Sequence, residues 1–264
     1  MNKLRKFHKN GYEFFISIIK VQGELNNINL NEATILDFGC GKGNLLKRLK
    51  EESIGSVLCG IDIFNSQEEL DFAKNNSNIE EIKAIKPYQN IPFDYKFDII
   101  TANQVFEHIE DKNKVFDQLK NSLKDGGILI TGFPTKEIIV EPHLKLPLIH
   151  FLPKRSFIQN LYLKLAYVAR LGCFNSKKKN NEIFTKVSNY LNDSIFHKNY
   201  FWYKKNLNKY FRKTIDISYC GLYSFRKNSN INNSIKILLS NIYPRTLRNF
   251  LINKIFSVLL ICLK

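Results

Sequence analysis

A glycine-rich turn near residue 40 constrains the fold of this 264-residue chain more than any other feature. Residues 35–49 read ILDFGCGKGNLLKRL: an apolar run closes on Asp37, the chain turns through Gly39, Gly41 and Gly43, and leucines follow at helical spacing. A buried strand, a glycine turn and a helix start form the first half of a βαβ unit. Such glycines let the backbone approach a ligand, and the helix presents free N–H groups to it. A tight turn without a ligand is the alternative.

Further apolar runs of strand length follow the turn. They occupy residues 57–64, 82–85, 97–103 and 128–134. Their alternation with helical patterns predicts an α/β fold with a doubly wound parallel sheet. In such a sheet, ligands bind outside the carboxyl ends of the strands. Asp62 lies at that end of its run, where a carboxylate can accept hydrogen bonds from a ribose diol, although a solvated loop acid is the alternative.

Two phosphate-binding motifs do not fit the turn. A dinucleotide fingerprint needs a third glycine at position 44, where this chain has Asn44. A P-loop needs Gly-Lys followed by Ser or Thr, whereas Lys42 is followed by Gly43.

The spacing Asp-x-Gly-x-Gly-x-Gly from residue 37 to residue 43 resembles instead the first motif of class I S-adenosylmethionine-dependent methyltransferases, of the kind grouped as methyltransferase types 11 and 12. Later segments match that family in order. Residues 60–62 match its ribose-binding acid, residues 97–109 its fourth strand and Glu-His segment, and residues 123–130 its Leu-Lys-Pro-Gly-Gly strand entry. The resemblance implies a Rossmann-like core that uses S-adenosylmethionine as cofactor.

The resemblance also assigns the cofactor-binding residues. They are Asp37, Gly39, Gly41, Gly43, Asp62, Ile63 and Asn103. The glycines and their neighbours would lie against the methionine part, Asp62 would hold the ribose hydroxyls, and Asn103 would sit beside the cofactor. Many family members also place an acid after the third strand to bind adenine, but here residues 86–90 read Lys-Pro-Tyr-Gln-Asn. Stacking on Tyr88, the amide of Gln89 and backbone contacts are all open for adenine.

The order of these motifs predicts the domain organisation. Residues 1–134 and 201–225 would form the core, residues 135–200 an inserted cap over the substrate, and residues 226–264 a basic C-terminal helical region. Within the insertion, residues 141–153 resemble those of surface-polysaccharide methyltransferases.

Charge is unevenly placed along the chain. Residues 1–150 carry 19 Lys+Arg and 21 Asp+Glu, whereas residues 151–264 carry 21 and 3. The basic second half predicts an anionic partner: a membrane surface, a nucleic acid or a phosphorylated substrate.

The C-terminal residues 245–264 suggest where a membrane could bind. Their longest uncharged apolar run, residues 255–263, is far shorter than the ~20 residues of a spanning helix. Interleaved Lys and Arg predict an amphipathic helix in the membrane interface, with a helix docked on the core or on a second copy as the alternative. Five cysteines without a Cys-x-x-Cys pair fit a reduced chain. We therefore expect a cytoplasmic protein, peripheral on the inner face of the membrane if this helix binds there.

Histidines are the candidate catalytic groups, because a hydroxyl acceptor must lose a proton. His108 follows the fourth strand, where substrate should approach, and His143 lies in the insertion that would cover it. Capping or packing is the alternative role for His108, and packing or phosphate contact for His143 and His150. No cluster has metal-ligand spacing, so we predict no metal.

These features favour O-methylation of a sugar on a lipid-linked or polymeric surface glycan. A small lipophilic acceptor, such as a quinone precursor or a lipid, is the first alternative, and RNA is the second. The fourth strand ends in residues 103–106, Asn-Gln-Val-Phe, without the Pro-Pro-aromatic sequence with which such enzymes grip a base, and this argues against a nucleic acid.

Overall fold

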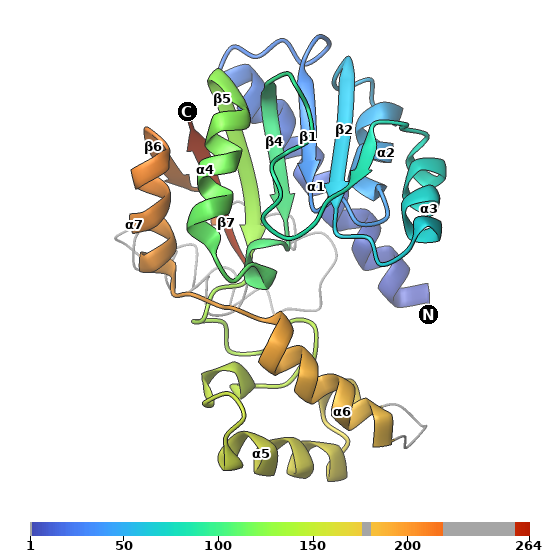
Figure 1. Cartoon of the computed structure of the whole chain (residues 1–264), viewed down its shortest axis with the longest axis vertical. Helices are drawn as coiled ribbons and strands as arrows, with labels where there is room; N and C mark the ends of the chain where they lie inside the picture. Colours follow the sequence, from blue (N-terminus) through green and yellow to red (C-terminus); the bar gives the residue numbers. More distant parts are fainter. Residues whose placement is uncertain (1, 176–180, 219–256) are drawn as a thin grey trace, which may run out of the picture.

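One sheet forms the centre of the computed structural model, which describes residues 2–175, 181–218 and 257–264 (Figure 1). Its strands are β1 (Thr34–Phe38), β2 (Val57–Asp62), β3 (Ile82–Ala84), β4 (Phe97–Asn103), β5 (Leu123–Phe133), β6 (Lys213–Asp216) and β7 (Val258–Leu263). They are arranged in the order β3-β2-β1-β4-β5-β7-β6. Strands β1 to β5 run parallel, whereas β7 is antiparallel to both neighbours. The predicted α/β fold is confirmed.

Helices cover both faces of the sheet and bury two hydrophobic layers. One layer lies under α1 (Asn2–Leu25), α2 (Asn44–Glu51) and α3 (Gln67–Ser77), and the other under α4 (Lys112–Ser122) and α7 (Tyr200–Tyr210). In β1, the side chain of Ile35 joins the first layer and that of Leu36 joins the second. Because successive side chains of a strand point to opposite faces, a strand buried on both faces is apolar at nearly every position.

The C-terminal residues 258–263 are a strand, so the helix predicted for this part of residues 245–264 is wrong. β7 lies between β5 and β6, and five of its six residues are buried. Its sequence, VLLICL, is an unbroken apolar run, which a helix and a doubly buried strand can share. Because β7 has a neighbouring strand on each edge and buried side chains on both faces, this segment has no free surface for a membrane. Residues 245–256 lie outside the described residues.

The chain between β5 and α7 forms a small helical body, which we call the cap (residues 135–199; Figure 1). Its elements are η2 (Ile149–Phe151), α5 (Phe157–Val168), η3 (Gly172–Phe174), α6 (Asn181–Asn189) and the π-helical turn η4 (Tyr190–Ser194). Leu146, Leu163 and Leu191 belong to a hydrophobic cluster separate from the two layers of the sheet. The cap lies beyond the carboxyl ends of the parallel strands (Figure 1). Among the described residues, none of the helices combines the length and apolar character needed to cross a membrane.

Candidate active site at the carboxyl edge of the sheet

The glycine turn after β1 needs glycine for two physical reasons. Gly39, Gly41 and Gly43 all have positive φ, at 80°, 50° and 70°, which side chains disfavour. At Gly39 an added Cβ would also lie 2.3 Å from Cγ2 of Val105. At Gly41 it would meet only Asp62, at 3.9 Å, so the backbone there is open to a ligand. The turn is therefore tightly packed on one side and accessible on the other.

Asp62 ends β2 and is held by the turn. Its Oδ2 accepts a hydrogen bond from the backbone N–H of Gly41 at 2.6 Å, and its Oδ1 accepts one from that of Ile63 at 2.6 Å. A carboxylate has about four acceptor sites, so each oxygen can still accept one hydroxyl. Asp62 is thus oriented for a diol.

Asp37 lies beneath the turn and is buried. Its Oδ1 accepts a hydrogen bond from Thr101 Oγ1 at 2.8 Å. Burial raises the pKa of Asp37 to about 7; the Thr101 hydroxyl acts in the opposite direction, and the charge of Asp62 adds to the rise. A cationic group bound nearby would favour the ionised carboxylate.

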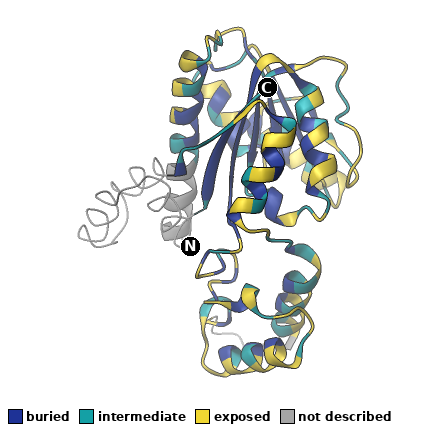
Figure 2. Ribbon diagram, turned by 90° about the vertical axis from the view of Figure 1, so that its left-hand side faces the viewer, coloured by how far each residue is buried: buried dark blue, intermediate teal, exposed yellow. Residues whose placement is uncertain are grey.

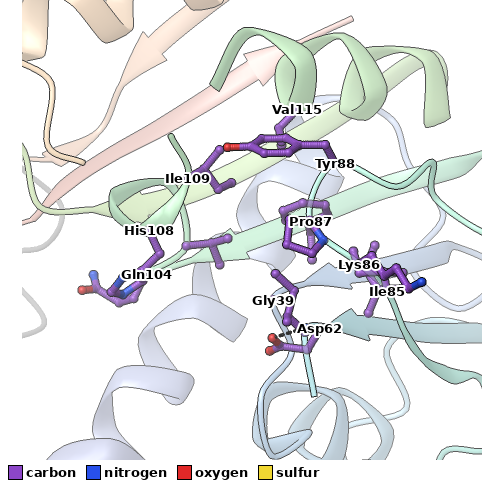
Figure 3. A pocket seen from close by; sticks show the side chains of 14 residues that line it. Gly39, Asp62, Ile85, Lys86, Pro87, Tyr88, Gln104, His108, Ile109 and Val115 are labelled. Carbon is purple, nitrogen blue, oxygen red and sulfur yellow. Dashed lines mark hydrogen bonds between the residues drawn. The ribbon is translucent and has the colours of Figure 1, made fainter. Parts of the chain in front are cut away.

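A cavity of about 420 Å³ opens beside the turn (Figure 3). In Figure 3, Asp62 lies at one end and the ring of Tyr88 at the other, with Gly39 and Pro87 between them. Apolar side chains from the strand ends and the following loops, among them Ile109, complete the wall. The volume and the mixed lining fit a nucleoside-sized ligand.

The loop after β3 contains the two side chains considered for adenine, Tyr88 and Gln89. Tyr88 lines the cavity, and its hydroxyl accepts a hydrogen bond from the backbone N–H of Asp111 at 2.9 Å. The amide oxygen of Gln89 instead accepts the backbone N–H of Lys86 at 2.9 Å, and Gln89 does not line the cavity. Of the two side chains considered for adenine, Tyr88 is the one in position.

Several of the predicted cofactor residues do not line this cavity. Gly41 lines a neighbouring pocket with Asp62. An added Cβ at Gly43 would lie 2.8 Å from the carbonyl oxygen of Ala73, so this glycine lets the turn pack on α3. Asn103 packs against Gly132, and the next residue, Gln104, lines the cavity in its place. The cofactor contacts of all seven predicted residues stay predictions.

Gln104 was missed by the sequence reasoning. It has a positive φ of 59°, and its side-chain amide donates to Ser257 Oγ at 3.1 Å. Non-glycine residues in this conformation are uncommon and often lie at functional sites. No sequence pattern predicts a positive φ at a glutamine.

The cap brings His143 to the residues that follow β4. His143 Nε2 lies 3.7 Å from Glu107 Oε1, and the rings of His143 and His108 are 5.4 Å apart. His108 lines the cavity, and its Nδ1 donates to the backbone carbonyl of Ser194 at 2.8 Å. The ring of Tyr190 contacts both histidines. The structure thus brings together the two predicted catalytic histidines.

Glu107 has an unusual environment within this cluster. It is fully buried, and neither carboxylate oxygen has a hydrogen-bond partner in the part of the chain that the structure describes. Glu107 is the main cause of the raised pKa of His143; burial lowers that pKa and Glu141 raises it further. Glu107, His108 and His143 offer ligand atoms within 4.8 Å of one another, as a metal site requires. Sequence spacing could not indicate this grouping, and the absence of a metal stays a prediction.

Known proteins resemble the chain in sequence and in fold. A family model described as "Methyltransferase domain" matches residues 9–181. A ubiquinone biosynthesis O-methyltransferase of Coxiella burnetii is 31% identical over 106 residues, covering 39% of this chain and 44% of that protein. A malonyl-[acyl-carrier protein] O-methyltransferase of Ilyobacter polytropus is 28% identical over 102 residues, covering 36% of this chain and 37% of that protein. The matched region therefore spans less than half of these curated relatives.

Solved structures add evidence on the fold alone. A methyltransferase from Mesorhizobium loti superposes with a TM-score of 0.51 at 14% identity, covering 89% of this chain and 92% of that one. Magnesium protoporphyrin IX methyltransferase from Synechocystis gives 0.50 at 13% identity, covering 97% and 83%. Since the family model covers well over half of the chain, the protein belongs to the methyltransferase-domain family, with the class I fold and S-adenosylmethionine as its cofactor.

Proposed function

We propose that this protein methylates a hydroxyl oxygen, with His108 as the general base. The observation that carries the proposal is the buried carboxylate of Glu107, which has no hydrogen-bond partner among the described residues and lies beside His143 and His108, next to the cavity. S-adenosylmethionine supplies an electrophilic methyl group when bound. The protein's own part is to position the acceptor and to remove its proton.

The hydrogen bonds of His108 suit a base. Because a carbonyl oxygen only accepts, the bond to Ser194 places the proton of the neutral ring on Nδ1. Nε2 then carries the lone pair that can take a proton. Glu107 supplies negative charge beside the imidazolium that forms, and His143 brings its ring from the cap to this carboxylate. Glu107 and His143 are positioning residues in this scheme.

A second cavity, of about 680 Å³, favours an acceptor that carries phosphate. It is lined by Lys136, Lys154, Lys198 and other residues of the cap, and Glu110, the one lining residue outside the cap, is the one acidic residue among them. Burial, together with nearby Lys198 and Lys154, lowers the pKa of Lys112 to about 7, while Glu107 and Glu110 oppose the change. A bound phosphate would relieve this crowding of cations. The sugar of a lipid-linked glycan, joined to its carrier through phosphate, combines such a group with a hydroxyl.

A quinone precursor is a second candidate acceptor, favoured by the relatives. The sequence relatives named above are both O-methyltransferases, and one is named for ubiquinone biosynthesis. A hydroxyl is the reacting group in both cases.

The test is methyl transfer by the purified full chain. Radiolabelled S-adenosylmethionine is offered with a lipid-linked oligosaccharide fraction or with a catechol-type quinone precursor, and the product is identified by mass spectrometry. We expect a methyl ether on one of them; label found only on amines or nucleic acid would overturn the proposal.

A chelator control separates proton transfer by His108 from catalysis by a bound metal ion. Activity should survive EDTA, and its loss with recovery in a divalent cation would contradict the role of His108.

A further inference from the structure

Helix α5 of the cap is apolar on two opposite faces. Toward the cap interior it buries Leu163 and Ala166. Outward it exposes five large apolar side chains: Phe157 80%, Ile158 59%, Leu161 44%, Leu165 61% and Val168 78%. With 3.6 residues per turn these five fall within an arc of about 100°, on the side away from the buried pair. We call them the outer face of α5.

Helix α5 lies at the end of the molecule farthest from the sheet (Figure 1). In the view turned by 90°, the cap again lies at the end of the molecule, and exposed residues are seen on its helices (Figure 2). Nothing in the described residues covers these side chains. A helix with apolar residues all round is normally buried, and large exposed apolar patches mark binding surfaces. The outer face is therefore a candidate binding surface.

Charge identifies the kind of partner. Between Glu141 and Glu182 the sequence has no Asp or Glu and eight Lys and Arg residues. Lys164 belongs to α5 itself and Arg170 follows its last turn; both side chains are exposed. A second copy of the chain would bring two strongly basic segments together, which repulsion between like charges opposes. An apolar stripe with cations close by is instead the pattern of helices that lie in the interface of an anionic bilayer.

We propose that the outer face of α5 docks on an anionic lipid bilayer, with its apolar side chains at the boundary of headgroups and acyl chains and with Lys164 and Arg170 at the lipid phosphates. This contact on the cap would be separate from the one expected at residues 245–264, of which residues 245–256 lie outside the described residues. Docking there would bring the cap and its basic cavity to the surface where lipid-linked molecules are found. The proposal does not depend on which hydroxyl is methylated.

Vesicle flotation tests the apolar part. The full chain is mixed with phosphatidylcholine vesicles with or without phosphatidylglycerol. We expect flotation with the anionic vesicles and about tenfold weaker binding for the double variant Phe157→Gln/Leu165→Gln. The matched control, Val21→Gln/Phe201→Gln, replaces exposed apolar side chains outside the cap and should float like the wild type. Unchanged binding of S-adenosylmethionine shows that both variants are folded.

The charge part has its own pair of variants. Lys164→Gln/Arg170→Gln should lose most of the preference for phosphatidylglycerol, whereas Lys47→Gln/Lys205→Gln, on exposed residues outside the cap, should keep it. Equal flotation of wild type and outer-face variant overturns the proposal. So does a wild type that stays unbound and forms a dimer which the outer-face variant dissolves, because a second copy would then cover α5.

Discussion

Glu107 Oε1 lies 3.7 Å from His143 Nε2, although the two residues belong to different bodies of the protein. Glu107 is in the short helix η1 (Phe106–His108) directly after β4, and His143 is in the cap. The carboxylate has no other ion-pair or hydrogen-bond partner among the described residues. The imidazole of His143, from the cap, is therefore the group that faces the negative charge of Glu107, from the core. The contact couples the position of the cap to the protonation of the site.

Replacing Glu107 by Gln should lower the pKa of His143, because Glu107 is the largest cause of its rise. We expect kcat to fall while the affinity for S-adenosylmethionine stays unchanged. NMR titration of the His143 ring reports the pKa, and steady-state kinetics report kcat. Glu24→Gln, at an exposed position of α1, is the matched control. An unshifted His143 titration in Glu107→Gln would exclude the coupling.

His108→Gln should lower kcat by about 10²–10⁴-fold, the usual contribution of a general base. Cofactor affinity should change little, because the hydrogen bond and ring contacts of His108 go to Ser194, His143 and Tyr190 of the cap. Pre-steady-state methyl transfer over a pH series checks the role. Loss of a base should slow the methyl-transfer step and leave the melting temperature unchanged, whereas loss of a packing residue should lower the melting temperature.

Asp62→Ala should weaken binding of S-adenosylmethionine by about 10–100-fold, as expected when a carboxylate that accepts hydrogen bonds from hydroxyls is removed. The change also frees the N–H groups of Gly41 and Ile63, so part of the loss reflects a looser turn. Calorimetric titration measures the affinity. Asp71→Ala, an exposed acid on α3, is the control for net charge, and equal affinity of the two variants would refute the assignment of Asp62.

The raised pKa of Asp37 predicts how the ligand-free protein responds to pH. The folded-state pKa of about 7 lies above the unfolded value, so between about pH 4 and pH 7 the folded state binds the extra proton. The contribution of Asp37 to stability is present at low pH and is lost as the pH rises to 7. Asp37→Asn should remove this slope and raise the free energy of unfolding at neutral pH by about 2–4 kcal/mol. Urea unfolding at several pH values checks it, and S-adenosylmethionine should bind the variant more weakly.

The sequence was sufficient for features that depend on local patterns. Apolar runs predict strands β1 to β5, and the glycine spacing predicts the turn from Asp37 to Gly43, with bounds that differ from the structure by a few residues. β7 was missed because its apolar run is compatible with either helix or strand, and its partner β5 lies more than a hundred residues earlier. The contact of Glu107 with His143 could not be predicted from the sequence either, because it forms only when the cap packs against the core.

Gly39→Ala tests the packing of the turn against the loop after β4. Its Cβ would require both a positive φ of 80° and an approach of 2.3 Å to Val105, so we expect a loss of about 3 kcal/mol or more in the free energy of unfolding. Gly126→Ala is a matched control, with a φ of 79° but no atom within 4 Å of the new Cβ, and it should cost only about 1–2 kcal/mol. Adding Val105→Ala to Gly39→Ala should recover the difference between them, because it removes the clash and leaves the backbone strain. Chemical denaturation of the three variants measures these losses, and equal losses for Gly39→Ala and Gly126→Ala would show that the loop yields to the new methyl group.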